Sequence, residues 1–221
     1  MKIITIIDFN CPYSYIGLNR LNNAINNLNL NVEWEIQSFE LEPQLKTEEF
    51  VSTVERYSSK YHLSYEKALE KINEIEEIAS EDGLNINFKD LKLSSSKNAH
   101  RLVKFSQKKY AEKTKELVEK IFYANFVENK NISDSVLLIE IAVSCGLNEN
   151  EVRKILESDS YEIEVDLDLE EALFNGITAT PYYIIYKDEE KLLIPGVFSQ
   201  KEFEIALNDL VSGKIYNKTF L

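Results

Sequence analysis

Cys11 is the residue whose neighbours in the sequence most favour chemistry. It follows a short apolar run at 3–7 and precedes a segment, 18–28, with apolar residues at helical spacing. Pro12 comes next and suits the first position of a helix, where an N–H group would have no partner anyway. A thiol at a helix start faces unpaired N–H groups and the positive end of the helix dipole, which favour the reactive thiolate. We therefore predict that Cys11 is a nucleophile with a lowered pKa.

The bland alternative is that Cys11 is a small core residue, because free cysteines are among the most buried side chains. Ser14 lies one helical turn later. Its hydroxyl can donate a hydrogen bond to a thiolate, or it can satisfy backbone groups of the first turn, and the two roles are compatible. Ser14 cannot resolve a mixed disulfide as a second thiol would.

The two ends of the chain predict the strands and helices that must position Cys11. The spacing of apolar residues predicts a strand–helix–strand unit at the start and two further strands with a helix at the end. A Ser-x-x-Glu capping box opens the last helix. In chain order we expect a strand at 3–7, a helix at 15–29, strands at 31–37, 182–186 and 191–194, and a helix from 199.

The middle of the chain has helical spacing from about residue 47 and no clear strand pattern. We expect helices near 69–79, 117–126 and 136–142, and another that begins at 148. The sequence therefore predicts an α/β protein of two domains. Residues 1–43 and 167–221 form a discontinuous domain, and residues 44–166 form an all-helical insertion.

Three motifs resemble those of one family. The run Cys-Pro-Tyr-Ser at 11–14 resembles the Cys-Pro-x-Cys site of DsbA-like thioredoxin-fold oxidoreductases, and its continuation Tyr-Ile-Gly is similar to the FrnE-type branch. Residues 176–181 resemble the cis-proline segment of the family, and residues 98–102 a motif of the helical insertion. That branch is related to 2-hydroxychromene-2-carboxylate isomerases and kappa-class glutathione transferases. Ser14 departs from the pattern, because oxidoreductases carry their second cysteine there.

The resemblance implies a thioredoxin fold in which Pro181 is cis and lies beside Cys11. Without the resemblance we would expect a trans bond, since only about 5–6% of X-Pro bonds in folded proteins are cis. It further implies that the backbone of Thr180 pairs with an extended substrate, as an added strand does. Tyr13 and Tyr182 would form apolar walls of this groove.

Pro12 and His100 complete the residues that we assign to substrate binding. A lone histidine on a helix is more often structural than catalytic, so the alternative to a His100 that faces a cleft between the two domains is a structural residue of its helix. With only His62 elsewhere and no cysteine cluster, we expect no metal site and no permanently bound cofactor. Cys145 is predicted to be a core residue that does not pair with Cys11.

The formal net charge of −13 argues against nucleic acid and anionic membranes as partners, because both are bound through clustered Lys and Arg. No apolar run reaches membrane-spanning length, and the first apolar run is too short for a signal-peptide core. Two cysteines in 221 residues give no disulfide framework, which is typical of a reducing compartment. We therefore expect a cytoplasmic protein.

The predicted function is a cytoplasmic DsbA-like thiol–disulfide oxidoreductase. The resemblance implies that Cys11 and Ser14 form a one-thiol site, which exchanges or isomerises disulfides of protein or small-molecule substrates. One alternative is a glutathione-dependent transferase or isomerase related to the kappa class, with glutathione or another low-molecular-weight thiol as cosubstrate. Another is a non-catalytic binding protein on this scaffold. We also consider a homodimer as its oligomeric state.

Overall fold

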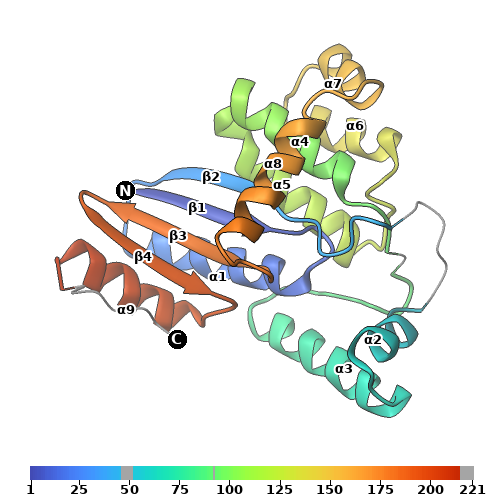
Figure 1. Ribbon diagram of the computed structural model, residues 1–221, viewed down its shortest axis with the longest axis horizontal. Helices are drawn as coiled ribbons and strands as arrows, with labels where there is room; N and C mark the ends of the chain where they lie inside the picture. Colours follow the sequence, from blue (N-terminus) through green and yellow to red (C-terminus); the bar gives the residue numbers. More distant parts are fainter. Residues whose placement is uncertain (46–51, 92, 215–221) are drawn as a thin grey trace. The chain divides into compact units, whose positions relative to one another are not determined.

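The computed structural model describes residues 1–45, 52–91 and 93–214 and divides into two compact units (Figure 1). The first unit combines Met1–Leu41 with Asp166–Leu221, and the second is Glu42–Val165. The sequence prediction ended the corresponding segments at residues 43 and 166. The predicted start of helical spacing near residue 47 lies outside the described residues.

A four-stranded sheet with the order β2-β1-β3-β4 is the frame of the first unit. β1 pairs in parallel with β2, and β3 runs antiparallel to both β1 and β4. This βαβ and ββα arrangement is the thioredoxin fold that the sequence predicted. Its elements are β1 (Lys2–Ile7), α1 (Pro12–Asn27), β2 (Glu33–Ser38), β3 (Tyr182–Lys187), β4 (Glu190–Pro195) and α9 (Gln200–Val211).

Helices cover both faces of this sheet (Figure 1). On one face, residues of α1 and α9 pack with the inward side chains of the strands, among them Tyr183 and Phe203. On the other face, Ala172 of α8 (Glu162–Phe174) packs with Ile6, and Tyr182 joins that cluster. Successive strand residues point to opposite faces, so the neighbouring tyrosines of β3 lie in different clusters. The sequence analysis did not predict α8, and its expected boundary at residue 166 falls inside this helix.

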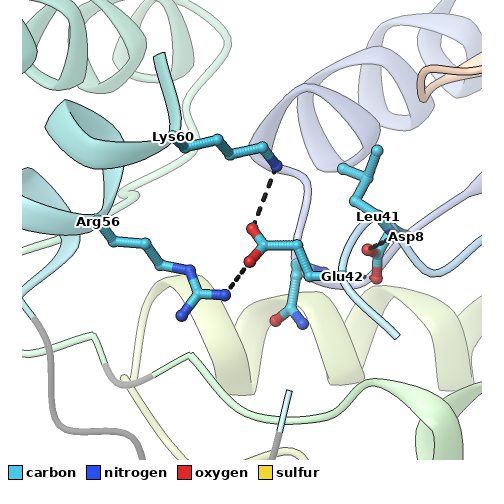
Figure 2. Close-up of polar contacts among 6 residues, drawn as sticks. Asp8, Leu41, Glu42, Arg56 and Lys60 are labelled. Carbon is cyan, nitrogen blue, oxygen red and sulfur yellow. Dashed lines mark hydrogen bonds and ion pairs between the residues drawn. The ribbon is translucent and has the colours of Figure 1, made fainter. Parts of the chain in front are cut away.

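The described part of the second unit is helical, with no strand, as predicted. Its helices are α2 (Thr53–Tyr61), α3 (Tyr65–Glu81), α4 (Lys97–Lys109), α5 (Ala111–Phe126), α6 (Ser135–Ser144) and α7 (Glu149–Leu156). Glu42, at the start of this unit, pairs with Arg56 and with Lys60 at 3.1 Å, which ties the incoming chain to α2 (Figure 2). Among the described residues, no helix has the length and apolar content needed to cross a membrane.

Arg101 explains part of the motif at 98–102. Its guanidinium is buried and donates to the carbonyl groups of Ile155 at 2.6 Å, Ser158, and Ser160 at 2.8 Å. The last carbonyl groups of a helix have no partner within the helix. Arg101 therefore closes the end of α7 and has a structural role in this unit.

Candidate active site

The turn that carries Cys11 is held by Asp8, which follows β1. The buried Asp8 carboxylate accepts a hydrogen bond from the backbone N–H group of Asn10 at 3.0 Å. It accepts another from the N–H group of Leu41 at 2.8 Å (Figure 2). The N–H of Cys11 donates to the Asp8 carbonyl oxygen at 3.0 Å. Asp8 thus fixes the start of α1 to the chain that leaves β2. Cys11 is the N-cap residue of α1 and Pro12 lies in its first turn, as predicted.

The Cys11 thiol contacts the far end of the chain. Only 5% of Cys11 is exposed, and its Sγ donates to the carbonyl oxygen of Thr180 at 3.3 Å, across 169 positions of sequence. The Thr180–Pro181 peptide bond is cis, which confirms the prediction. In this structure the Thr180 carbonyl accepts the hydrogen bond of the thiol, and its pairing with an extended substrate stays a prediction.

Burial raises the pKa of the Cys11 thiol, because the charged thiolate is poorly solvated in the site. Hydrogen bonding by the side chain of Thr180, and by the side chain and backbone of Ser14, acts in the opposite direction. The negative charge of Asp8 adds to the increase. The prediction of a lowered pKa is therefore wrong for this closed arrangement, since desolvation outweighs the donors at the helix start.

Among the described residues, three buried hydroxyl groups of the site make no hydrogen bond of normal geometry in the resting structure. The hydroxyl oxygens of Ser14, Thr180 and Tyr183 are buried, and none makes a hydrogen bond of normal geometry to another described residue. Those of Ser14 and Thr180 are close enough to the sulfur to affect its pKa. Buried polar groups without partners are rare in proteins and point to a functional site or to a partner that is absent.

Tyr183 is the residue of this group that the sequence analysis missed. It lies fully buried on β3, edge-on to Phe203 with ring centroids 5.2 Å apart. Gly17 makes room for it, because a Cβ atom at that position would lie 2.2 Å from the Tyr183 hydroxyl oxygen. Period-two alternation along β3 would have shown that Tyr182 and Tyr183 face opposite sides. It does not tell which of the two faces α1.

The other predicted residues are distributed as follows. Pro12 and Tyr13 are partly exposed beside Cys11 in the chain. Tyr182 packs on the α8 side of the sheet, with Ile6, Ala172 and Ile177. Its assignment to the groove wall stays a prediction.

His100 is not brought into one unit with Cys11, since it lies fully buried on α4 of the second unit. Cys145, at the end of α6, is buried and, like Cys11, forms no disulfide. Among the described residues, no three His, Cys, Asp or Glu side chains are grouped so that they could hold a metal ion.

Comparisons with known proteins agree with this geometry. The family described as "DSBA-like thioredoxin domain" matches residues 2–208. The uncharacterized protein YwbO of Bacillus subtilis (strain 168) is 27% identical over 206 residues, which cover 91% of this chain and 93% of YwbO. The fold is similar to that of a probable DsbA oxidoreductase from Streptomyces coelicolor, with a TM-score of 0.85, 25% identity, and coverage of 100% of this chain and 94% of that one.

Another solved structure, with lower sequence identity, is similar to this chain in fold only. It is the cytosolic disulfide reductase DsbM from Pseudomonas aeruginosa with GSH, at a TM-score of 0.63 and 11% identity, covering 96% of this chain and all of that one (100%). The family match extends over Cys11 at the start of α1 and over the cis bond before Pro181. This chain therefore belongs to the family of DSBA-like thioredoxin domains.

Proposed function

We propose that this protein is a thiol–disulfide exchange enzyme that works with one active cysteine, Cys11. The observation that carries the proposal is the placement of the Cys11 thiol at the start of α1, 3.3 Å from the carbonyl oxygen before the cis-proline, with Ser14 one turn later. The chain belongs to the DSBA-like thioredoxin domains and is similar in fold to a probable DsbA oxidoreductase, which supports this chemistry.

Exchange begins when the Cys11 thiol releases its proton to solvent and its hydrogen bond to the Thr180 carbonyl is broken. The thiolate attacks one sulfur of a substrate disulfide, so that a Cys11–substrate disulfide forms and the other substrate sulfur departs as a thiolate. The Thr180 carbonyl oxygen, which has lost the thiol as its donor, can then accept a hydrogen bond from an N–H group of an extended substrate. This sequence gives the carbonyl both roles, a partner for the resting thiol and a docking group for the substrate.

An external thiol completes the cycle, because the Ser14 hydroxyl cannot attack a disulfide. Its thiolate attacks the substrate sulfur of the mixed disulfide, forms a new disulfide with the substrate and releases the Cys11 thiolate. The net reaction moves a disulfide from one pair of thiols to another without net oxidation of the protein. A one-thiol site that needs an external thiol suits a reducing compartment such as the cytoplasm.

The test is to challenge the full chain with oxidised glutathione and to locate adducts by peptide mass spectrometry. We expect a mixed disulfide on Cys11, none there in Cys11→Ser, and an unchanged adduct on Cys11 in the control variant Cys145→Ser. Insulin reduction with an excess of a small thiol then measures turnover. Insulin reduction at the same rate with the unmodified protein and Cys11→Ser would refute the proposal.

A glutathione-dependent transferase or isomerase is the second candidate, because the Ser14 hydroxyl is fully buried beside the thiol without an ordinary partner. Such an enzyme would bind a cosubstrate thiol without forming a disulfide to it. S-methylglutathione separates the two candidates, since it has no free thiol. Stoichiometric binding of this analogue by calorimetry, without turnover in the insulin assay, would favour the second candidate.

A further inference from the structure

The hydroxyl of Tyr183 lies against α1 at Gly17. The position of a Cβ atom built on Gly17 is 2.2 Å from this hydroxyl oxygen, 3.2 Å from Cγ of Pro181 and 3.4 Å from Cγ2 of Val197. Gly17 lies one helical turn after Ser14. The Tyr183 hydroxyl is therefore enclosed between the first turns of α1 and the cis-proline segment.

This hydroxyl has no partner in the resting structure. Tyr183 is fully buried, and its hydroxyl oxygen makes no hydrogen bond to any described residue. A buried hydroxyl without a partner is unfavourable, and phenylalanine would fill the same space without this penalty. The hydroxyl would be satisfied in a state in which a neighbour becomes an acceptor. The group nearby that becomes a strong acceptor during exchange is the sulfur of Cys11.

The ionisation of the two groups fits such a pairing. Burial raises the pKa of Tyr183 well above that of a free tyrosine, and the negative charge of Cys11 raises it further, whereas the positive charge of Arg20 acts in the opposite direction. Tyr183 therefore keeps its proton under conditions in which the thiol ionises. A protonated phenol is a donor, and hydrogen bonds to charged acceptors are stronger than those to neutral ones.

We propose that Tyr183 is a positioning residue of the exchange reaction, whose hydroxyl donates a hydrogen bond to the Cys11 sulfur once the thiolate has formed. This inference rests on Cys11 as the nucleophile. The resting thiol is directed to the Thr180 carbonyl at 3.3 Å. When the thiol loses its proton, it no longer donates a hydrogen bond to that carbonyl. The hydroxyl groups of Ser14 and Tyr183 then stabilise the charged sulfur.

Tyr183→Phe tests the proposal, because it removes the hydroxyl oxygen and keeps the ring that packs on Phe203. We expect the pKa of Cys11 to rise by about one unit, since a hydrogen bond to a charged group has that order of strength. The measurement is the pH dependence of iodoacetamide alkylation, with the Cys11 peptide followed by mass spectrometry. The alkylation rate near pH 7 should fall about tenfold with the thiolate fraction.

Tyr186→Phe is the matched control, because it removes the same atom from the same strand at an exposed position. It should leave the pKa of Cys11 unchanged. The thermal unfolding midpoint of Tyr183→Phe should be equal to or above that of the unmodified protein, since the lost hydroxyl has no partner at rest. A lower midpoint with an unchanged pKa would mean that the hydroxyl is structural and would overturn the proposal.

Gly17→Ala is a second test of this role. Its added methyl group displaces the Tyr183 hydroxyl and should also raise the pKa of Cys11. An unchanged pKa in both variants refutes the role of Tyr183, whichever of them folds well. None of these measurements uses a disulfide substrate. A shift in the pKa of Cys11 in the variants, with no insulin reduction by the unmodified protein, would uphold this inference and refute the proposed function. Insulin reduction that depends on Cys11, with no shift in this pKa, would uphold the proposed function and refute this inference.

Discussion

Asp8 and the hydroxyl groups around Cys11 act on the ionisation of the thiol in opposite directions. The Asp8 charge raises the pKa of Cys11, whereas the side chains of Thr180 and Ser14 lower it. The turn needs Asp8 as an acceptor for two backbone N–H groups. The acidic residue that holds Cys11 in place therefore also restrains its reactivity.

We predict that Asp8→Asn lowers the pKa of Cys11, because the amide keeps one acceptor oxygen and removes the negative charge. The shift is opposite in sign to that expected for Tyr183→Phe, and the same alkylation profile measures both. The control variant Asp188→Asn removes an equal charge from the exposed turn after β3, and it should leave the pH dependence of Cys11 alkylation unchanged. A raised pKa in Asp8→Asn would contradict the electrostatic role assigned to the carboxylate.

Ser14→Cys restores a thiol at the position of the resolving residue. Ser14 is buried one turn after Cys11, and side chains at this spacing at a helix start are within reach of a disulfide. We expect the variant to form a disulfide between positions 11 and 14 and to reduce insulin faster than the unmodified protein. The unmodified protein should instead accumulate mixed disulfides with oxidised glutathione. Equal and negligible insulin reduction by both proteins would favour the transferase or the binding protein.

At the scale of elements, the approach of α1 to β3 is set by Gly17. Alanine is normally favoured over glycine within a helix by about 0.5–1 kcal/mol. A Cβ at Gly17 would, however, collide with the Tyr183 hydroxyl at 2.2 Å. We predict that Gly17→Ala lowers the free energy of unfolding by about 1–3 kcal/mol, as overpacking does in cores.

The double variant Gly17→Ala with Tyr183→Phe provides the control, because removal of the hydroxyl oxygen relieves the collision. Denaturant unfolding of the four proteins gives the interaction energy between the two positions. We expect at least half of the loss to be recovered in the double variant. Additive effects would mean that α1 and β3 do not meet at these atoms.

Several elements could be predicted because their signals are local. The start of α1 follows from Cys11 and Pro12, and the last helix follows from its capping box at Ser199, which the structure contains. α8 was missed because its apolar residues do not form a single stripe. Ile163 is 70% exposed and Phe174 is 91% exposed, whereas Ala172, between them in sequence, is buried.

The parts of the site that could not be predicted depend on contacts between distant segments. Two adjacent tyrosines look alike in sequence, and only the pairing of Thr5 with Tyr183 in the sheet fixes which side chain faces α1. The sign of the pKa shift of Cys11 depends on burial by the Thr180 segment. A helix start predicts donors near a thiol, but it does not predict how much water is excluded.

At the scale of the whole molecule, the thioredoxin-like unit is made of two segments separated by the helical unit. Contacts between the two segments hold it together, among them the hydrogen bond from the Ser38 N–H to the Asp168 carboxylate at 2.7 Å. Both segments also contribute to the candidate site, with Cys11 and Ser14 from the first and Thr180 and Tyr183 from the second. The site is therefore complete only when both are present.

This division has a consequence for the newly made chain. Cys11 is synthesised 169 residues before Thr180. At ribosomal rates of about 5–20 residues per second, this separation corresponds to roughly 10–30 s. During that interval the thiol lacks the Thr180 carbonyl that it contacts in the folded protein, so it is open to oxidants and to small disulfides. The helical unit is continuous in sequence and can be finished first. The thiol that is buried in the folded protein is thus unprotected during synthesis.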